Sequence, residues 1–113
     1  MWKLVAGGAV AATLAVPVGL EARPQYLTTF ARTYSITSPL YKQRARLNTC
    51  KVCHTVTPAR NPYGAAFQRA HRSGVSVVQS FRNIQLRDSD GDGFTNVREI
   101  RAGKFPGRKS DHP

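Results

Sequence analysis

Acidic residues are scarce in this 113-residue chain, in which 6 Asp and Glu residues stand against 17 Lys and Arg residues. The formal net charge of +11 favours acidic proteins, anionic lipid head groups or nucleic acid as partners. The same charge is also typical of a basic protein that is simply kept soluble by it. Cysteine is equally scarce, because the two thiols of the chain are Cys50 and Cys53. No cysteine lies near the N-terminus, which argues against a lipid-anchored lipoprotein.

Long apolar runs are absent except near the N-terminus, where residues 4–20 consist largely of Ala, Val, Leu and Gly. The positive Lys3 precedes this run and the small Ala22 follows it, so residues 1–22 are predicted to be an export signal. The run is short for a membrane span, and glycines and a proline interrupt it. A retained N-terminal anchor is the alternative. We therefore expect an exported protein, periplasmic or extracellular, whose folded domain covers residues 23–113.

The rest of the chain predicts a small all-α fold without internal repeats. Apolar spacing places helices at about residues 24–34, 62–72 and 77–84, and a last short helix that ends at about Gly103. The second helix is expected to begin at the N-cap Asn61, which a proline follows. Val75 and Val77 also alternate as in a strand, which leaves a second interpretation of the third helix. Residues 40–47 are expected to form a basic turn, and residues 104–113 an irregular tail.

Both cysteines belong to one short segment, Cys50-Lys51-Val52-Cys53-His54. Covalent haem attachment needs two thiols that add to the two vinyl groups and a histidine that reaches the iron from the same side. This spacing meets both needs on one helical turn, so we predict haem c bound to Cys50 and Cys53 with His54 as proximal axial ligand. A Cys50–Cys53 disulfide or redox pair is the alternative. The adjoining His54 and the lack of a thioredoxin-like pattern weigh against that alternative.

Methionine is absent from the predicted mature chain, because the one methionine is Met1. A Met/His haem is therefore excluded, and the sixth ligand must come from elsewhere. His71 shares a predicted helix face with Tyr63 and Phe67, and small residues beginning at Gly64 would let that helix approach a flat macrocycle. We predict His71 as the distal axial ligand of a bis-His haem. His112, in a tail expected to be mobile, and an iron with an open or water-bound sixth position are the alternatives.

Most of the acidic residues gather in one twelve-residue segment, 88–99, which matches the EF-hand loop at every ligand position. The predicted ligands are Asp88, Asp90, Asp92, the backbone carbonyl of Phe94, Asn96 and Glu99. Oxygen donors alone suit a hard cation such as Ca²⁺. A solvated turn is the alternative, but four neighbouring carboxylates would repel one another without a cation. No second loop is present, so we expect a single structural site filled at roughly 10⁻⁴–10⁻³ M Ca²⁺.

Together with these two motifs, three further segments point to one group of proteins. They are the Arg23-Pro24-Gln25-Tyr26 start, the Asn61-Pro62-Tyr63-Gly64 helix start and the Phe105-Pro106-Gly107 tail. The chain resembles small secreted bacterial monohaem c-type cytochromes that carry an EF-hand-like, Asp-rich calcium loop after the haem segment. The resemblance implies a small cytochrome c-like helical haem domain and a role in electron transport.

We therefore expect one-electron transfer without enzymatic turnover. The cationic surface would guide docking to an acidic redox partner or to a membrane redox complex, or would place the protein on an anionic membrane surface. A peroxidase-like or gas-binding haem with an open sixth position is the alternative, in which Arg69 and Arg72 beside His71 could polarise bound oxygen species. Nucleic acid is not expected as a partner, because an exported haem protein rarely meets it.

Overall fold

The computed structural model describes residues 24–56 and 59–113, so the predicted export signal, residues 1–22, lies outside the described residues. The elements in chain order are α1 (Pro24–Thr33), η3 (Pro39–Leu47), η4 (Cys50–Val52), α2 (Pro62–Arg72), α3 (Val77–Ile84) and α4 (Asn96–Arg101). Across the described residues there is no strand, and the extended pairing is one isolated bridge between Val56 and Ala59. The all-α prediction is confirmed for this part of the chain. Within it, no helix is long and apolar enough to cross a membrane.

Side-chain caps set the starts of α2 and α3. The Oδ1 of Asn61 accepts a hydrogen bond from the amide of Gly64 at 3.0 Å, as the sequence predicts for an N-cap. The Oγ of Ser76 caps α3 in the same way, accepting from the amide of Gln79 at 3.1 Å. The strand-like alternation at Val75 is therefore not realised, because the capped helix satisfies the backbone locally.

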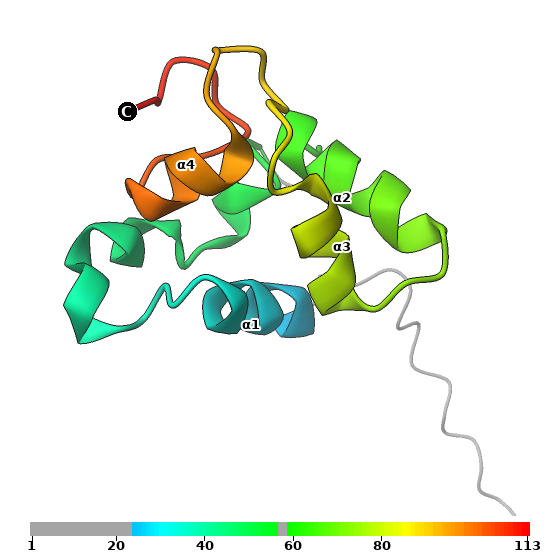
Figure 1. Ribbon diagram of the computed structural model, residues 1–113, viewed down its shortest axis with the longest axis horizontal. Coiled ribbons are helices and arrows are strands. Elements are labelled where there is room, and N and C mark those ends of the chain that lie inside the picture. Colours follow the sequence, from blue (N-terminus) through cyan, green and yellow to red (C-terminus); the bar gives the residue numbers. More distant parts are fainter. Residues whose placement is uncertain (1–23, 57–58) are drawn as a thin grey trace, which may run out of the picture.

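The core combines aromatic rings, mostly from α1, α2 and α3, with aliphatic residues from η3, η4 and α4. Figure 1 shows α2 and α3 packed together, with α1 crossing beside them. Phe30, Tyr63 and Phe81 are almost completely buried, and the Phe67 and Phe81 rings stack at 4.5 Å between centroids. The apolar face predicted for the first helix thus packs where expected, through Phe30 and Tyr34. Such ring pairs add to the burial of apolar area in a chain of this size.

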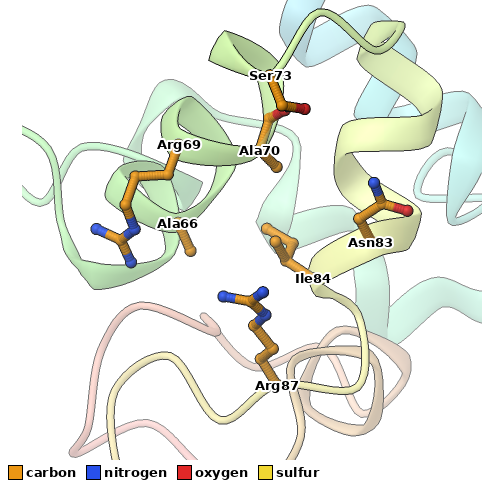
Figure 2. Close-up of a pocket in the computed structure, with 7 residues that line it drawn as sticks. All are labelled: Ala66, Arg69, Ala70, Ser73, Asn83, Ile84 and Arg87. Carbon is orange, nitrogen blue, oxygen red and sulfur yellow. The ribbon is translucent and has the colours of Figure 1, made fainter.

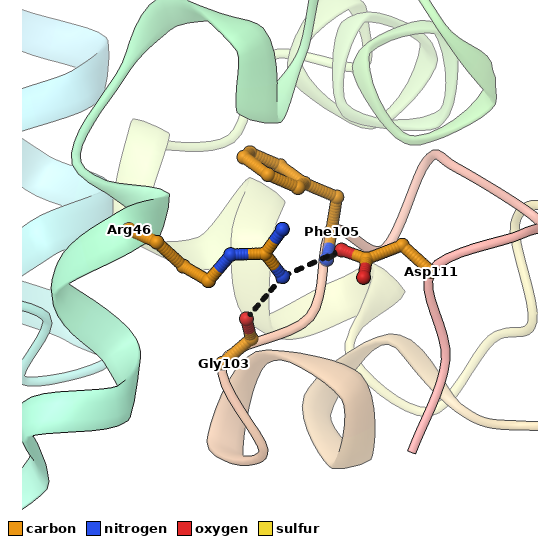
Figure 3. Close-up of polar contacts among 4 residues, drawn as sticks. All are labelled: Arg46, Gly103, Phe105 and Asp111. Atoms are coloured by element: carbon orange, nitrogen blue, oxygen red, sulfur yellow. Dashed lines mark hydrogen bonds and ion pairs between the residues drawn. The ribbon is translucent and has the colours of Figure 1, made fainter.

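The C-terminal tail is irregular, as expected, but it is not loose. Phe105 is 6% exposed and belongs to the core. Its amide donates to Asp111 Oδ2 at 2.8 Å. Arg46 of η3 donates from Nη1 to the same oxygen at 2.8 Å and to the Gly103 carbonyl at 2.9 Å (Figure 3). The tail is therefore fixed across η3 after α4 ends.

Candidate functional site

The cysteine segment forms a single turn of 3-10 helix, η4, which Thr49 caps through its side-chain oxygen. The amides of Cys53 and His54 both donate to the carbonyl of Cys50, at 3.2 and 3.0 Å. This turn places Cys50, Cys53 and His54 along one short element. Cys50 is exposed and Cys53 half-buried, and both thiols are free.

Burial, and to a smaller extent the neighbouring Cys50, raise the pKa of Cys53 to about 12. At neutral pH the Cys53 thiol is therefore protonated and a poor nucleophile for disulfide exchange.

Asn61 fastens η4 to the start of α2. Its amide N–H donates to the Cys53 carbonyl at 2.8 Å. Its side-chain Nδ2 donates to the carbonyls of Lys51 and Val52, at 3.3 and 3.2 Å. One buried side chain thus caps a helix and satisfies the last carbonyls of the cysteine turn. The cap was predicted from the sequence, whereas its contacts to η4 were not.

Two glycines allow this close packing. A Cβ at Gly64 would overlap the carbonyl oxygen of Cys53, and a Cβ at Gly107 would overlap the side chain of Asn61. Gly64 was predicted to let α2 approach a flat macrocycle. In the structure it gives room to the Cys53 backbone instead, so the helix start packs on the cysteine turn itself. The tail glycine Gly107 closes the other side of Asn61.

His54 is half-buried, with Nδ1 3.3 Å from the carbonyl oxygen of Ala59. A proton on Nδ1 would be donated to this carbonyl, and the lone pair would then reside on Nε2. Metal-binding histidines are commonly oriented by such a contact through their second ring nitrogen. The donor set of two thiols and one oriented imidazole therefore fits a covalently attached haem.

His71 lies at the C-terminal end of α2, in an aromatic environment. Its ring stacks on Phe67 at 5.6 Å between centroids and meets Tyr26 edge-on at 5.7 Å. Its Nδ1 lies 3.0 Å from the Val75 carbonyl and 3.4 Å from Ser80 Oγ. These hydrogen bonds and ring contacts orient the imidazole, and none of them comes from the cysteine turn.

His112 lies beside the acidic loop, which is the second candidate metal site. Its ring stacks on Phe94 with 5.6 Å between centroids. The tail before His112 is anchored by the hydrogen bond between the Phe105 amide and Asp111 and by the burial of Phe105. This placement does not favour His112 as a haem ligand.

The acidic loop gathers its carboxylates around one point. Oxygen atoms of Asp88, Asp90 and Asp92 lie within 4.8 Å of one another. The Asp88 carboxylate accepts hydrogen bonds from the amides of Gly91, Asp92 and Gly93, at 2.9, 3.1 and 2.8 Å. Gly91 and Gly93 have φ of 72° and 93°, a conformation that glycine adopts without a steric penalty. The backbone thus wraps around Asp88 at the first loop position.

Glu99 of α4 lies close to these aspartates. Its side chain is 0% exposed, and among the described residues no hydrogen-bond donor reaches either of its carboxylate oxygens. The Oδ2 atoms of Asp90 and Asp92 are likewise buried without a donor. Burial of a carboxylate in this state is costly unless a positive charge or a proton compensates it.

The pKa values of the loop reflect this crowding. Burial, the Asp92 side chain beside it and the charges of Asp90, Asp92 and Asp88 raise the pKa of Glu99 to about 9. Burial and the charge of Asp92 raise the pKa of Asp90 to about 6. Without a bound cation, protons offset the repulsion between these carboxylates. The donors of the loop are all oxygen atoms, which fits a hard divalent cation.

Asn96 was predicted as a cation ligand, and in the structure its side chain makes hydrogen bonds within the protein. Its Nδ2 donates to the Ile84 carbonyl at 2.8 Å and to Ser89 Oγ at 2.7 Å, and its Oδ1 accepts from the Ser89 amide at 3.3 Å. These bonds tie the start of α4 to the end of α3 and close the loop. Since its amide is committed to them, we leave Asn96 out of the cation ligands proposed below.

Comparisons with known protein families, with curated proteins and with solved structures found no match to this chain.

Proposed function

We propose that this chain is an exported monohaem c-type cytochrome that transfers single electrons. The observation that carries the proposal is the η4 turn, which holds Cys50 and Cys53 on one turn that His54 follows, with the His54 imidazole in contact with the Ala59 carbonyl. Haem bound there supplies one-electron chemistry between its ferric and ferrous states.

In this proposal the chain's own residues hold the site in place. Cys50 and Cys53 form the thioether links, and His54 is the proximal ligand. Asn61 and Gly64 keep the Cys53 backbone against α2, so that the ligand His54 leaves the turn in a fixed direction. Fixed ligands favour electron transfer, because little rearrangement then accompanies a change of oxidation state.

We propose His71 as the distal ligand. With its Nδ1 directed to the Val75 carbonyl, its Nε2 would carry the lone pair that iron requires. The Phe67 and Tyr26 rings restrict rotation of the imidazole. Bis-His ligation lowers the reduction potential relative to Met/His ligation.

We also propose that the acidic loop binds one calcium ion. Its ligands would be Asp88, Asp90, Asp92, Glu99 and the backbone carbonyl of Phe94. The donor-free carboxylate oxygens of Glu99 support this site. Since the loop leads directly into α4, the ion would stabilise the fold near the C-terminal tail, and it has no part in the redox step.

The redox partner that we propose is an acidic protein or a membrane redox complex. The formal net charge of +11 would steer such a partner to the protein, and an anionic membrane surface would attract it in the same way. The association rate with an acidic partner should therefore fall as salt is added.

Absorption spectra of the exported protein, ferric and ferrous, with and without carbon monoxide, test the proposal. We expect low-spin haem spectra that carbon monoxide does not change. In His71→Ala the ferric spectrum should become high-spin and carbon monoxide should bind, whereas His112→Ala should leave both spectra unchanged. A high-spin wild-type spectrum would contradict His71 ligation and favour the peroxidase-like alternative. Absence of any haem band would contradict the cytochrome itself.

A further inference from the structure

A cleft of about 390 Å³ lies between α2, α3 and the segment that follows α3. Figure 2 shows its lining residues, which are Ala66, Arg69, Ala70, Ser73, Asn83, Ile84 and Arg87. Its volume is within the lower part of the range of small-molecule sites, roughly 300–1,000 Å³. None of the seven residues is acidic.

The cleft is separate from the cysteine turn. A helix turns by about 100° per residue, so Ala66, Ala70 and Ser73 lie on the side of α2 roughly opposite Gly64. Gly64 is the residue that packs against Cys53. The cleft therefore opens on the face of α2 opposite Gly64, which the proposed haem site does not use. Binding of a ligand to the cleft can be measured separately from haem binding.

Two arginines and an apolar floor give the cleft its chemistry. Arg69 extends from α2, and Arg87 projects from beyond the end of α3 toward Ala66 and Ile84 (Figure 2). Ala66 and Ile84 are buried, at 4% and 1% exposure. Neither guanidinium has a hydrogen bond or ion pair within residues 24–56 and 59–113, where the one ion pair joins Arg46 and Asp111.

Two guanidinium groups without acidic partners at one cleft favour an anionic ligand. Guanidinium suits carboxylate and phosphate oxygens in particular, because its N–H groups match their geometry. Ala66, Ala70 and Ile84 line the cleft beside the two arginines, and the half-buried Ala70 gives it accessible apolar surface. The cleft thus matches an anion that carries a short apolar group.

We propose that this cleft binds a small amphipathic anion, a carboxylate or phosphate ester. Its head group lies between Arg69 and Arg87, and its apolar part covers Ala66, Ala70 and Ile84. A free metabolite and the head-group region of an anionic lipid share this chemistry, and the experiment below separates the two sources.

Titration calorimetry of the full exported chain with hexyl phosphate and inorganic phosphate tests the site. Burial of the hexyl group should make hexyl phosphate bind about tenfold or more tightly than inorganic phosphate. Arg69→Gln combined with Arg87→Gln should abolish binding of both. Arg32→Gln combined with Arg82→Gln removes the same charge from exposed positions outside the cleft and should change affinity less than twofold.

Ala70→Leu fills the apolar side of the cleft and leaves its charge unchanged. It should reduce the affinity for hexyl phosphate to that for inorganic phosphate. Circular dichroism and thermal melting of each variant confirm that it is folded. Equal affinities of the two ligands in the wild type, or equal losses in the two arginine double variants, would overturn the proposal.

Vesicles of anionic phospholipid distinguish the sources of the ligand. If the Arg69/Arg87 double variant loses vesicle binding while the Arg32/Arg82 double variant retains it, the cleft accepts lipid head groups. If both double variants bind vesicles equally and only the former loses hexyl phosphate, the ligand is a soluble anion. Vesicle binding without any binding of hexyl phosphate would contradict the site.

Discussion

The cysteine turn and the acidic loop differ in what they lack. In the cysteine turn, Asn61 satisfies the carbonyls of Lys51, Val52 and Cys53. In the acidic loop, Glu99 is buried and none of its carboxylate oxygens meets a donor. The proposed calcium site therefore rests on buried carboxylates without donors, whereas the proposed haem site rests on the types and spacing of its side chains.

This difference predicts different consequences of losing each ligand. Loss of the cation leaves repelling carboxylates and should cost stability. Loss of the thioether links should abolish haem retention, while the Asn61 contacts remain in place. The two regions are also joined: α4 begins at the loop, and the tail after it brings Gly107 against Asn61.

The largest effect is expected at the cysteine turn. Cys53→Ser removes one thioether link, and Cys50→Ser combined with Cys53→Ser removes both. The double variant should retain essentially no haem after denaturation and gel electrophoresis with haem staining. Asp88→Asn changes the other site and should keep its haem, which makes it the matched control. Haem retained covalently by the double cysteine variant would show that the attachment lies elsewhere.

The next effect is the stability that the cation adds. At a Ca²⁺ concentration of 100 times Kd, binding adds about 2.7 kcal/mol to the free energy of unfolding. For a domain of this size that raises Tm by roughly 10–20 °C. Thermal melting with Ca²⁺ and with a chelator measures it. Glu99→Gln should remove most of the difference, and identical wild-type melting curves would refute the calcium site.

The cation-free loop should also make stability depend on pH. Folded Glu99 keeps its proton up to about pH 9, whereas an unfolded chain releases it near pH 4.5. The folded state therefore holds more protons between these values, and the free energy of unfolding falls as pH rises from about 4.5 to about 9. Denaturant titrations in chelator should show this slope, and saturating Ca²⁺ should reduce it. A chelated protein equally stable at pH 5 and pH 8 would contradict the burial of an uncompensated Glu99.

A smaller effect is expected at the contact between α2 and the cysteine turn. Gly64→Ala places a Cβ against the Cys53 carbonyl and should lower the free energy of unfolding by about 1–3 kcal/mol. Gln68→Ala on the same helix should change it by less than about 0.5 kcal/mol. Chemical denaturation measures both. If Gly64→Ala were as stable as the wild type, the close packing of α2 on η4 would be disproved.

The smallest effect concerns the exposed ion pair that fixes the tail. Arg46→Met breaks the contacts to Asp111 and Gly103 and should cost about 0.2–1 kcal/mol, because an exposed pair gains little in water. Lys42→Met, also on η3 and exposed, is the control. Amide hydrogen exchange in residues 103–111 should increase in Arg46→Met and not in Lys42→Met. Unchanged exchange would show that the tail is held by Phe105 alone.

Local features of the fold were predictable from the sequence, and long-range contacts were not. The α2 start followed from Asn61, and the acidic loop from the spacing of its aspartates, because caps and turns depend on residues a few positions apart. The contacts of Gly64 with Cys53 and of Gly107 with Asn61 depend on how distant segments pack. The hydrogen bonds of Asn96 could not be predicted either, because the EF-hand pattern gives the same residue a ligand role.

The central claim is that Cys50 and Cys53 hold haem covalently. Intact mass spectrometry of the denatured, exported protein, made in a host that matures c-type cytochromes, tests it most directly. We predict the mass of the processed chain plus one haem, with a haem absorption band that persists through acid and organic extraction. A protein with the mass of the bare chain, or with haem that is extracted completely, would contradict the claim.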